Sequence, residues 1–150
     1  VQVVNVQDSA VATTTTVMPG DDTIPQITEG AEIMTLAITP TSSSNKLLIE
    51  VVFHIGHSTA GNWLTCALFN TDSHSTNALT AAIGYSHTTT GTTENQSFNY
   101  YMTAPSTSST TFRVRTGSAA AGTTTFNGTA GSRLMGGVIA SSITITEISA

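Results

Sequence analysis

The chain has 150 residues, a net charge of −5 and only 9% charged residues, and Thr and Ser together make up close to a third of it. Four Lys and Arg are too few to neutralise a nucleic-acid backbone, which excludes a basic nucleic-acid-binding protein. An apolar content of 39% with so little charge also excludes charge-driven disorder, and the scarcity of Glu, Lys and Leu argues against a coiled coil or helical bundle. The length predicts one domain, residues 1–150, and the start at Val1 is compatible with a fragment of a longer protein.

The dominant hydropathy period along the chain is two residues, and β-branched residues are abundant in the alternating segments. Leu47, Ile49, Val51 and Phe53 form the clearest alternating face. Such alternation is typical of half-buried strands, and no segment predicts a helix. The predicted strands are 2–6, 10–18, 31–39, 46–56, 62–70, 79–86, 94–103, 110–117, 123–127 and 132–148 with a break.

Short strands separated by Pro-, Gly- and Ser-rich turns predict an all-β fold. Two similar segments, Pro40–Ile49 and Pro105–Val114, each consist of a Pro and Ser/Thr turn followed by an alternating strand. They are either two arms of two Greek keys or unrelated Ser-rich turns. The first alternative favours a jelly-roll-like antiparallel β-sandwich of about 8–10 strands. If the arms are neighbours, Glu50 would pair with Arg113 or Arg115 on the surface.

The C-terminal part of the chain carries two further signals. Gly136-Gly137 interrupts a strong strand pattern, which predicts a β-bulge or a close backbone approach. The segment 142–148 is apolar at alternate positions and would be a hazard as an open edge. We therefore expect it inside a sheet or at a subunit interface.

Bulky apolar residues are few, and the one cysteine, Cys66, cannot form an intrachain disulfide. We therefore expect part of the apolar burial to occur between copies of the chain, as in a homotrimer. No stretch approaches the length of a membrane span, and no signal peptide is visible at the start, so membrane insertion is not expected.

No residue pattern predicts catalysis, a metal or a cofactor. His54 and His57 are three apart on a predicted strand and face opposite sides, while His74 and His87 fall in predicted loops. The acids at 21, 22 and 72 lie in turns without a calcium-loop pattern, and no nucleophile motif is present. Cys66 is expected to be a buried, unreactive thiol. The sequence thus predicts a protein without enzymatic activity.

The aromatic residues offer a binding hypothesis, because aromatic faces stack on sugar rings while Asn, Asp and Thr bind hydroxyl groups. The candidate ligand-binding residues are Asn62, Trp63, Asp72 and Tyr85. The alternative for each aromatic residue is packing in the core or in a subunit interface. Tyr100 and Tyr101 are adjacent, so one should point inward and the other outward.

Several segments resemble stretches of bacteriophage tail-fibre and related virion proteins. The first group is Asp22-Thr-Ile-Pro-Gln26, Thr28-Glu-Gly30, Leu36-Ala-Ile-Thr-Pro40 and Ser44-Asn-Lys-Leu-Leu-Ile-Glu50. The second group is Ser108-Ser-Thr-Thr-Phe-Arg-Val-Arg115, Phe126-Asn-Gly128, Gly131-Ser-Arg133 and Ser141-Ser-Ile-Thr-Ile-Thr-Glu-Ile148. The resemblance implies a trimeric jelly-roll fibre-head domain of a phage virion. The His-x-His metal motif of some fibre tips is absent.

The resemblance implies a non-enzymatic virion structural protein, a fibre or spike head that recognises a host-surface glycan or protein. Its expected partners are further copies of itself and other virion proteins, and its expected location is the tail or capsid exterior, after assembly in the host cytoplasm. The alternative is a purely structural trimerisation or capsid decoration module without a ligand. A carbohydrate-processing enzyme ranks last, because it requires paired acids in a groove.

Overall fold

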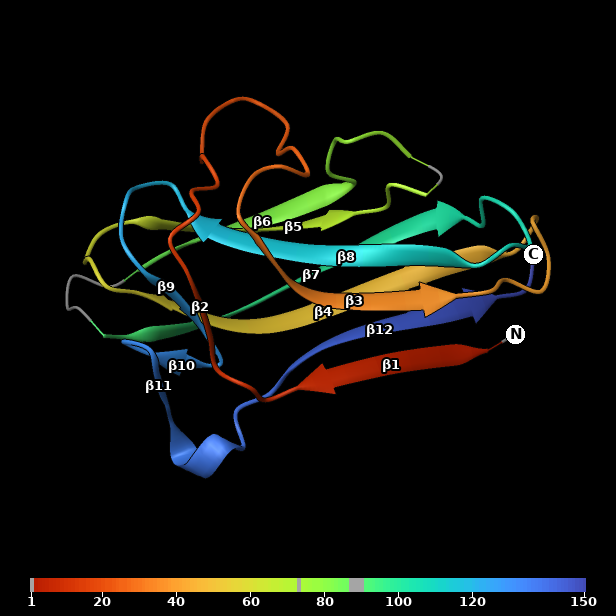
Figure 1. The fold of residues 1–150 in the computed structure, drawn as a ribbon. Helices are drawn as coiled ribbons and strands as arrows, with labels where there is room; N and C mark the ends of the chain where they lie inside the picture. The colour runs from red at the N-terminus through yellow and green to blue at the C-terminus, as the bar shows by residue number, and fades with distance from the viewer. Residues whose placement is uncertain (1, 73, 87–90) are drawn as a thin grey trace.

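Two antiparallel sheets stack face to face in the computed structural model, which describes residues 2–72, 74–86 and 91–150 (Figure 1). In the larger sheet, β1 (Val3–Asp8) pairs with β12 (Ser141–Ile148), which pairs with β4 (Lys46–His57). β9 (Thr124–Phe126) pairs with the end of β4 on the same side as β12 and also with β2 (Ala12–Thr14), while β7 (Thr93–Thr103) pairs with β4 on the other side. The smaller sheet contains β3 (Ala31–Ile38), β8 (Thr110–Ser118), β5 (Trp63–Phe69) and β6 (Thr80–Tyr85). A short hairpin joins β10 (Gly128–Thr129) to β11 (Ser132–Arg133).

The strand order identifies the fold as a jelly roll. The eight main strands in chain order are β1, β3, β4, β5, β6, β7, β8 and β12. One sheet contains the first, eighth, third and sixth of these side by side, and the other contains the second, seventh, fourth and fifth. All of the connections except the β5–β6 hairpin therefore cross between the sheets, which is the arrangement of two Greek keys. The predicted all-β, jelly-roll-like sandwich is confirmed.

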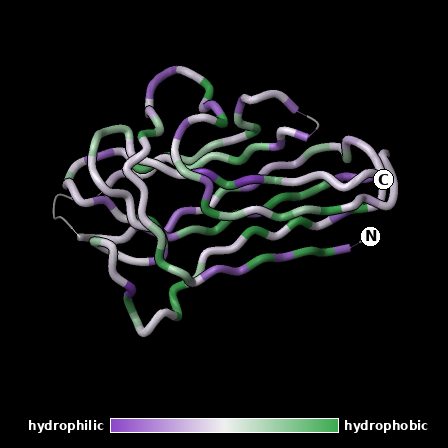
Figure 2. Tube along the Cα trace, in the orientation of Figure 1, coloured by the Kyte–Doolittle hydropathy of each residue, from purple (hydrophilic) through white to green (hydrophobic). Residues whose placement is uncertain are grey.

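The core lies between the sheets and follows the two-residue period of β4. Leu47, Ile49, Val51, Phe53 and Ile55 are all fully buried, while the residues between them face the outer side of the sheet. Hydrophobic positions are concentrated along the strands, and the loops are mostly polar (Figure 2). Side chains from the opposite sheet complete the core. They include Leu64, Cys66, Leu68, Phe112 and Val114.

The C-terminal strand β12 lies inside the larger sheet, as predicted, between β1 and β4. Its Ile143 and Ile145 are fully buried and contribute to the same core. One chain thus buries these core residues by itself. The homotrimer stays a prediction. Within the described residues, no helix is long and apolar enough to cross a membrane.

Two predicted strands are shorter in the structure. Of residues 10–18 only Ala12–Thr14 forms a strand, paired with β9, while Val17 makes an isolated bridge to Ser118. The expected bulge at Gly136-Gly137 is wrong: β11 ends at Arg133, and Met135–Gly137 forms a 3-10 turn before β12. Both glycines have positive φ, 67° and 90°, which explains why glycine occurs there. The same turn leaves the Met135 side chain 75% exposed.

The ion pair between the two Ser-rich arms is also wrong. The arm after Pro40 leads into β4 of one sheet, and the arm after Pro105 leads into β8 of the other. Arg113 instead lies 3.5 Å from Glu32 of the neighbouring strand β3. The inward and outward alternation of each arm is as predicted. The arms lie in opposite sheets, so their outward side chains are on opposite sides of the sandwich.

A buried carboxylate ties three segments together at one end of the sandwich. Glu147 in β12 is inaccessible to solvent, and its Oε1 accepts hydrogen bonds from the Thr41 backbone amide at 2.7 Å and from Asn45 Nδ2 at 2.7 Å. Gln2 donates to Oε2 at 3.1 Å. These donors, with Asn45 contributing most, lower the pKa of Glu147 to about 2. The carboxylate thereby holds the β3–β4 loop and the N-terminal segment against β12.

Glu147→Gln should lower the unfolding midpoint in denaturant at neutral pH, because the amide cannot accept all of these bonds. The pKa of Glu is about 4.3 in the unfolded state and lower in the folded state. The carboxylate of Glu147 therefore stabilises the folded protein fully at pH values above about 4.3. This stabilisation is lost as the pH falls through about 2. The difference between wild type and variant should therefore shrink between about pH 4 and pH 2. Glu50→Gln, on the exposed face of β4, is the control and should show no such narrowing.

Candidate functional site

The hairpin of β5 and β6 places two aromatic side chains side by side on the outer face of the smaller sheet. Leu64, Cys66 and Leu68 point into the core, so the period of two turns Trp63 outward. The register pairs Trp63 with Tyr85, and Ile83 lies on the same face of β6. Trp63 is 47% exposed, Tyr85 55% and Ile83 54%. Together these three residues form an apolar floor open to solvent.

The loop between β2 and β3 folds over this face and forms a wall beside the floor. Val17 forms a β-bridge with Ser118, and Gln26 forms one with Asn77, so both ends of the loop are fixed. Met18 is fully buried and packs on outward-facing residues of β5. The segment 19–25 therefore projects from a rigid base, and it stands above β5 and β6 in Figure 1.

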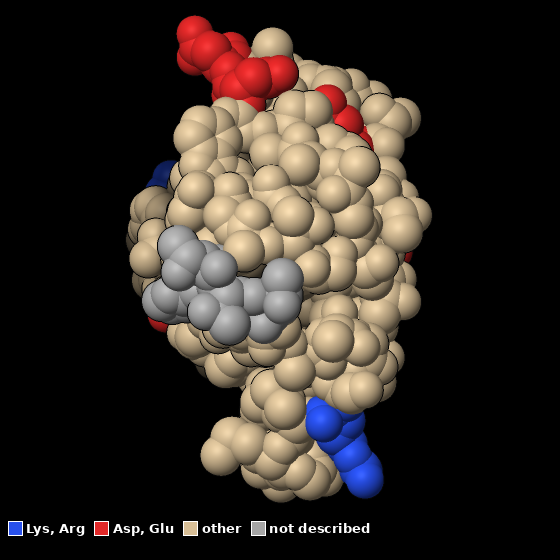
Figure 3. Space-filling model, turned by 90° about the vertical axis from the view of Figure 1, so that its left-hand side faces the viewer, with Lys and Arg blue, Asp and Glu red and all other residues tan. Residues whose placement is uncertain are grey.

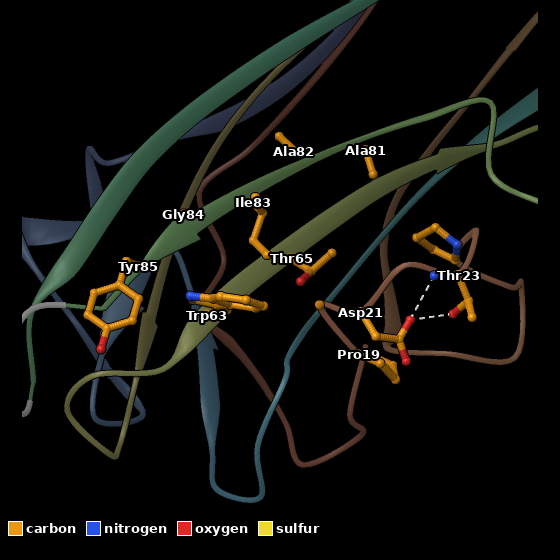
Figure 4. A pocket seen from close by; sticks show the side chains of 12 residues that line it. Pro19, Asp21, Thr23, Trp63, Thr65, Ala81, Ala82, Ile83, Gly84 and Tyr85 are labelled. Atoms are coloured by element: carbon orange, nitrogen blue, oxygen red, sulfur yellow. Dashed lines mark hydrogen bonds between the residues drawn. The ribbon is translucent and has the colours of Figure 1, made fainter.

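Floor and wall enclose an open cavity of about 620 Å³, within the usual range for small-ligand sites. Figure 4 shows the indole of Trp63 between the Tyr85 ring and the wall residues. The cavity is lined by Pro19, Gly20, Asp21, Thr23, Pro25, Trp63, Thr65, Ala81, Ala82, Ile83, Gly84 and Tyr85. It combines apolar and aromatic surface with a carboxylate and hydroxyl groups at one side.

Asp21 is the carboxylate of this cavity, and its own turn orients it. Its Oδ1 accepts hydrogen bonds from the hydroxyl of Thr23 and, at 2.9 Å, from the Thr23 backbone amide. These bonds, the hydroxyl contributing most, lower the pKa of Asp21 below its ordinary value. Asp21 therefore carries a negative charge at neutral pH.

Of the four predicted ligand-binding residues, the structure brings Trp63 and Tyr85 together. Asn62 precedes Trp63, but its Nδ2 lies 3.3 Å from Nδ1 of His57 at the end of β4 and donates to the Thr59 carbonyl in the turn before β5 at 3.5 Å. Asp72 lies beyond the far end of β5, roughly 20 Å along the strand from Trp63. Its Oδ2 accepts a hydrogen bond from the Thr111 backbone amide at 2.6 Å. Asn62 and Asp72 thus support local backbone rather than line the cavity.

The sequence reasoning missed Ile83 and the wall. Ile83 could have been found, because it shares the strand face of Tyr85 at a spacing of two residues. The wall residues at 19–25 are recognisable as a turn, but nothing local shows that this turn folds back over β5 and β6.

The other polar candidates are separated from one another. His54 lies on the outer face of β4, where burial lowers its pKa, and His57 is buried at the end of the same strand. His74 is exposed in a loop, and His87 lies outside the described residues. Burial raises the pKa of the Cys66 thiol well above its ordinary value, as expected for an unreactive thiol. In the described part of the chain, no three His, Cys, Asp or Glu side chains cluster as metal ligands.

No protein-family model and no curated protein matches the chain. A chain of the infectious bursal disease virus Gt strain structure matches 99% of it at 15% identity and a TM-score of 0.49, over 38% of that chain. A chain from work on CBM4 structure and function matches 80% of it at 16% identity and a TM-score of 0.40, over 68% of that chain. The EclA C-terminal domain, a sugar-binding protein, matches 80% of it at 10% identity and a TM-score of 0.42, over 75% of that domain.

The chain spans less than two-fifths of the length of the viral chains that it matches. The assignment of the jelly roll rests on the chain's own strand order.

Gly20→Ala should displace the indole of Trp63, because a Cβ at Gly20 would collide with Cε3 of Trp63 and lie 2.9 Å from Cδ1 of Ile83. Trp63 is the single Trp of the chain, so its fluorescence emission reports the displacement directly. The unfolding free energy should change by less than about 1 kcal/mol, because the contact lies outside the core. An unchanged emission spectrum would contradict the described contact between the wall and the floor.

Proposed function

We propose that this chain is a non-enzymatic jelly-roll domain of a virion structural protein, a phage fibre or spike head, that recognises a host-surface glycan. The motif resemblance of the sequence supports the fibre assignment and a place on the tail or capsid exterior, reached by assembly in the host cytoplasm. Copies of itself, as a homotrimer, and other virion proteins are its proposed partners. The glycan is proposed to bind in the cavity at Trp63 and Tyr85.

The observation that carries the glycan proposal is the paired exposure of Trp63 and Tyr85 beside Asp21. Exposed aromatic pairs next to hydroxyl and carboxylate groups suit a sugar ring, which has an apolar face and hydrogen-bonding edges. Burying these rings in a ligand complex would recover apolar contacts that the free protein leaves in water.

The acids near the cavity support binding rather than hydrolysis. Asp21 and Asp22 are neighbours in one turn, whereas glycosidases place two carboxyl groups across the scissile bond. Asp72, which the sequence predicted as a ligand-binding residue, accepts a hydrogen bond from the Thr111 backbone amide and does not line the cavity.

A second candidate function is a purely structural module for trimerisation or capsid decoration. It is favoured by the loop between β11 and β12, where Met135 is 75% and Val138 79% exposed. This loop protrudes from the sandwich below β10 and β11 in Figure 1. Two exposed apolar side chains on a projecting loop suit a contact with another virion protein.

Trp63→Ala should weaken binding of a recognised oligosaccharide at least tenfold, about 1.4 kcal/mol, because stacking on the indole is lost. Binding is measured by calorimetry after a glycan array has identified ligands. Tyr101→Ala is the matched control, because Tyr101 is 56% exposed but lies on β7 of the other sheet. Equal losses in both variants, or an array without any bound glycan, would overturn the glycan proposal.

The homotrimer is tested by the mass in solution. Three chains of 15.5 kDa give about 46 kDa by light scattering. A mass of one chain at all concentrations would contradict the trimer, while leaving the glycan proposal to its own test.

A further inference from the structure

The cavity at Trp63 continues into a second one, so the site is a groove along β6. The second cavity has a volume of about 390 Å³. The two share Asp21, Thr23, Pro25 and Ala81 as lining residues. From Tyr85 the groove runs beneath the wall towards the beginning of β6, where Ala78, Leu79 and Thr80 line it. Along six residues of β6 it is roughly 20 Å long, too extended for one sugar ring at the aromatic end.

Among the described residues, the charged side chains that line the groove are all negative. Its charged lining residues are Asp21 and Asp22. The chain has four basic side chains, and none of them lines either cavity. Figure 3 shows the largest group of acidic atoms at the upper end of the molecule, where the wall projects, and the largest group of basic atoms at the lower end. An acidic ligand would therefore meet repulsion without a compensating cation.

The four basic side chains all lie outside the groove. Arg115 donates to the backbone carbonyls of Glu29 and Gly30 at 2.9 and 2.7 Å, which fixes the base of the wall. The others are Arg113 beside Glu32, Lys46 bonded to Thr103, and Arg133 at the end of β11.

Asp21 lies where the two cavities meet, and it offers a hydrogen-bond acceptor to the ligand. Both bonds from Thr23 go to Oδ1, which leaves Oδ2 as the oxygen for a hydroxyl group of the ligand. A hydroxyl donates to a carboxylate readily, and such charge-assisted bonds are strong. A ligand carboxylate in the same place would be repelled.

We infer that the groove along β6 takes an extended, neutral oligosaccharide, and that Asp21 is the specificity residue that discriminates against acidic sugars. This inference rests on the proposed glycan-binding function, and it adds the length and the charge of the ligand. The outward side chains of the sheet face form the floor. Ring stacking on Trp63 and Tyr85 at one end of the groove favours a sugar over a peptide paired with the edge of β6.

The first experiment measures binding of neutral galacto-, gluco- and manno-configured oligosaccharides of one to six units, by quenching of Trp63 fluorescence and by calorimetry. Affinity for the recognised series should rise at least tenfold from the monosaccharide to the chain that spans the groove, and then level off. An affinity independent of length would overturn the extended groove.

Ala81→Ile tests the continuity of the groove, because Ala81 is exposed and lines both cavities. The variant should lose most of the gain from chain length while still binding the shortest ligand at Trp63. Ala37→Ile is the matched control, an exposed alanine on β3 at the opposite edge of the same sheet, and should bind as wild type. Retention of the full length dependence in Ala81→Ile would contradict the path along β6.

Asp21→Asn tests the charge discrimination. The asparagine oxygen can still accept the bonds of Thr23, so the turn should persist. Wild type should bind the neutral oligosaccharide more tightly than the matching uronate, such as galactotetraose against tetragalacturonate. The variant should reduce that preference by about fivefold, the factor for two unit charges about 4 Å apart in water. A wild type that binds the uronate equally well would overturn the role of Asp21.

The outcomes separate the two proposals. If no oligosaccharide quenches Trp63, the glycan-binding function itself fails. If a monosaccharide binds but neither length nor charge matters, glycan binding stands and the extended neutral ligand fails. Quenching by an extended peptide, with no response to any sugar, would overturn both in favour of strand addition at β6.

Discussion

The structure depends on the alternating burial of β4, which pairs along its whole length with β7 on one side and with β12 and then β9 on the other. Five of its side chains are fully buried at every second position. A shift of one residue in the register of β4 would move all five side chains to the solvent-facing side of the sheet. The register of the larger sheet is therefore strongly determined. Phe53 illustrates the packing: its ring meets Phe98 of β7 edge to face, at a centroid distance of 5.8 Å. With β4 set in this way, the smaller sheet has one apolar surface on which to pack.

The smaller sheet has a different problem, because its outer face is apolar too over β5 and β6, whereas β8 carries Arg113 and Arg115 there. Ala67 and Phe69 face outward on β5 yet are fully buried, since Met18 and the loops before β3 and β6 cover them. The cover stops before Trp63, which stays half exposed at the beginning of the same strand. The groove is thus the part of the apolar face of β5 and β6 that Met18 and these loops leave uncovered. This explains why an aromatic floor and the wall of residues 19–25 meet there.

Alternation is a local property, and the sequence therefore predicted the long strands and the orientation of their side chains well. Leu47 to Ile55, the outward Arg113 and Arg115, and the inward Cys66 are examples. Features that depend on non-local pairing were missed: residues 10–18 are rich in β-branched residues, but only 12–14 form a strand, and Val17 makes an isolated bridge to Ser118. The same holds for the site. Trp63 and Tyr85 were recognised as residues, but their pairing depends on the β5–β6 register, and Asp21 enters only because a loop folds back.

The turn that exposes Met135 also bears on the chemical durability of the protein. The other methionines are buried or half-buried, Met18 and Met34 almost completely, and the single thiol is enclosed in the core. An oxidant would therefore reach the Met135 thioether first and convert it to the sulfoxide. Because this side chain packs on no core residue, the sandwich would tolerate the added polar oxygen. With no disulfide within the chain to reduce and no accessible thiol to oxidise, the fold does not depend on the redox state of its surroundings.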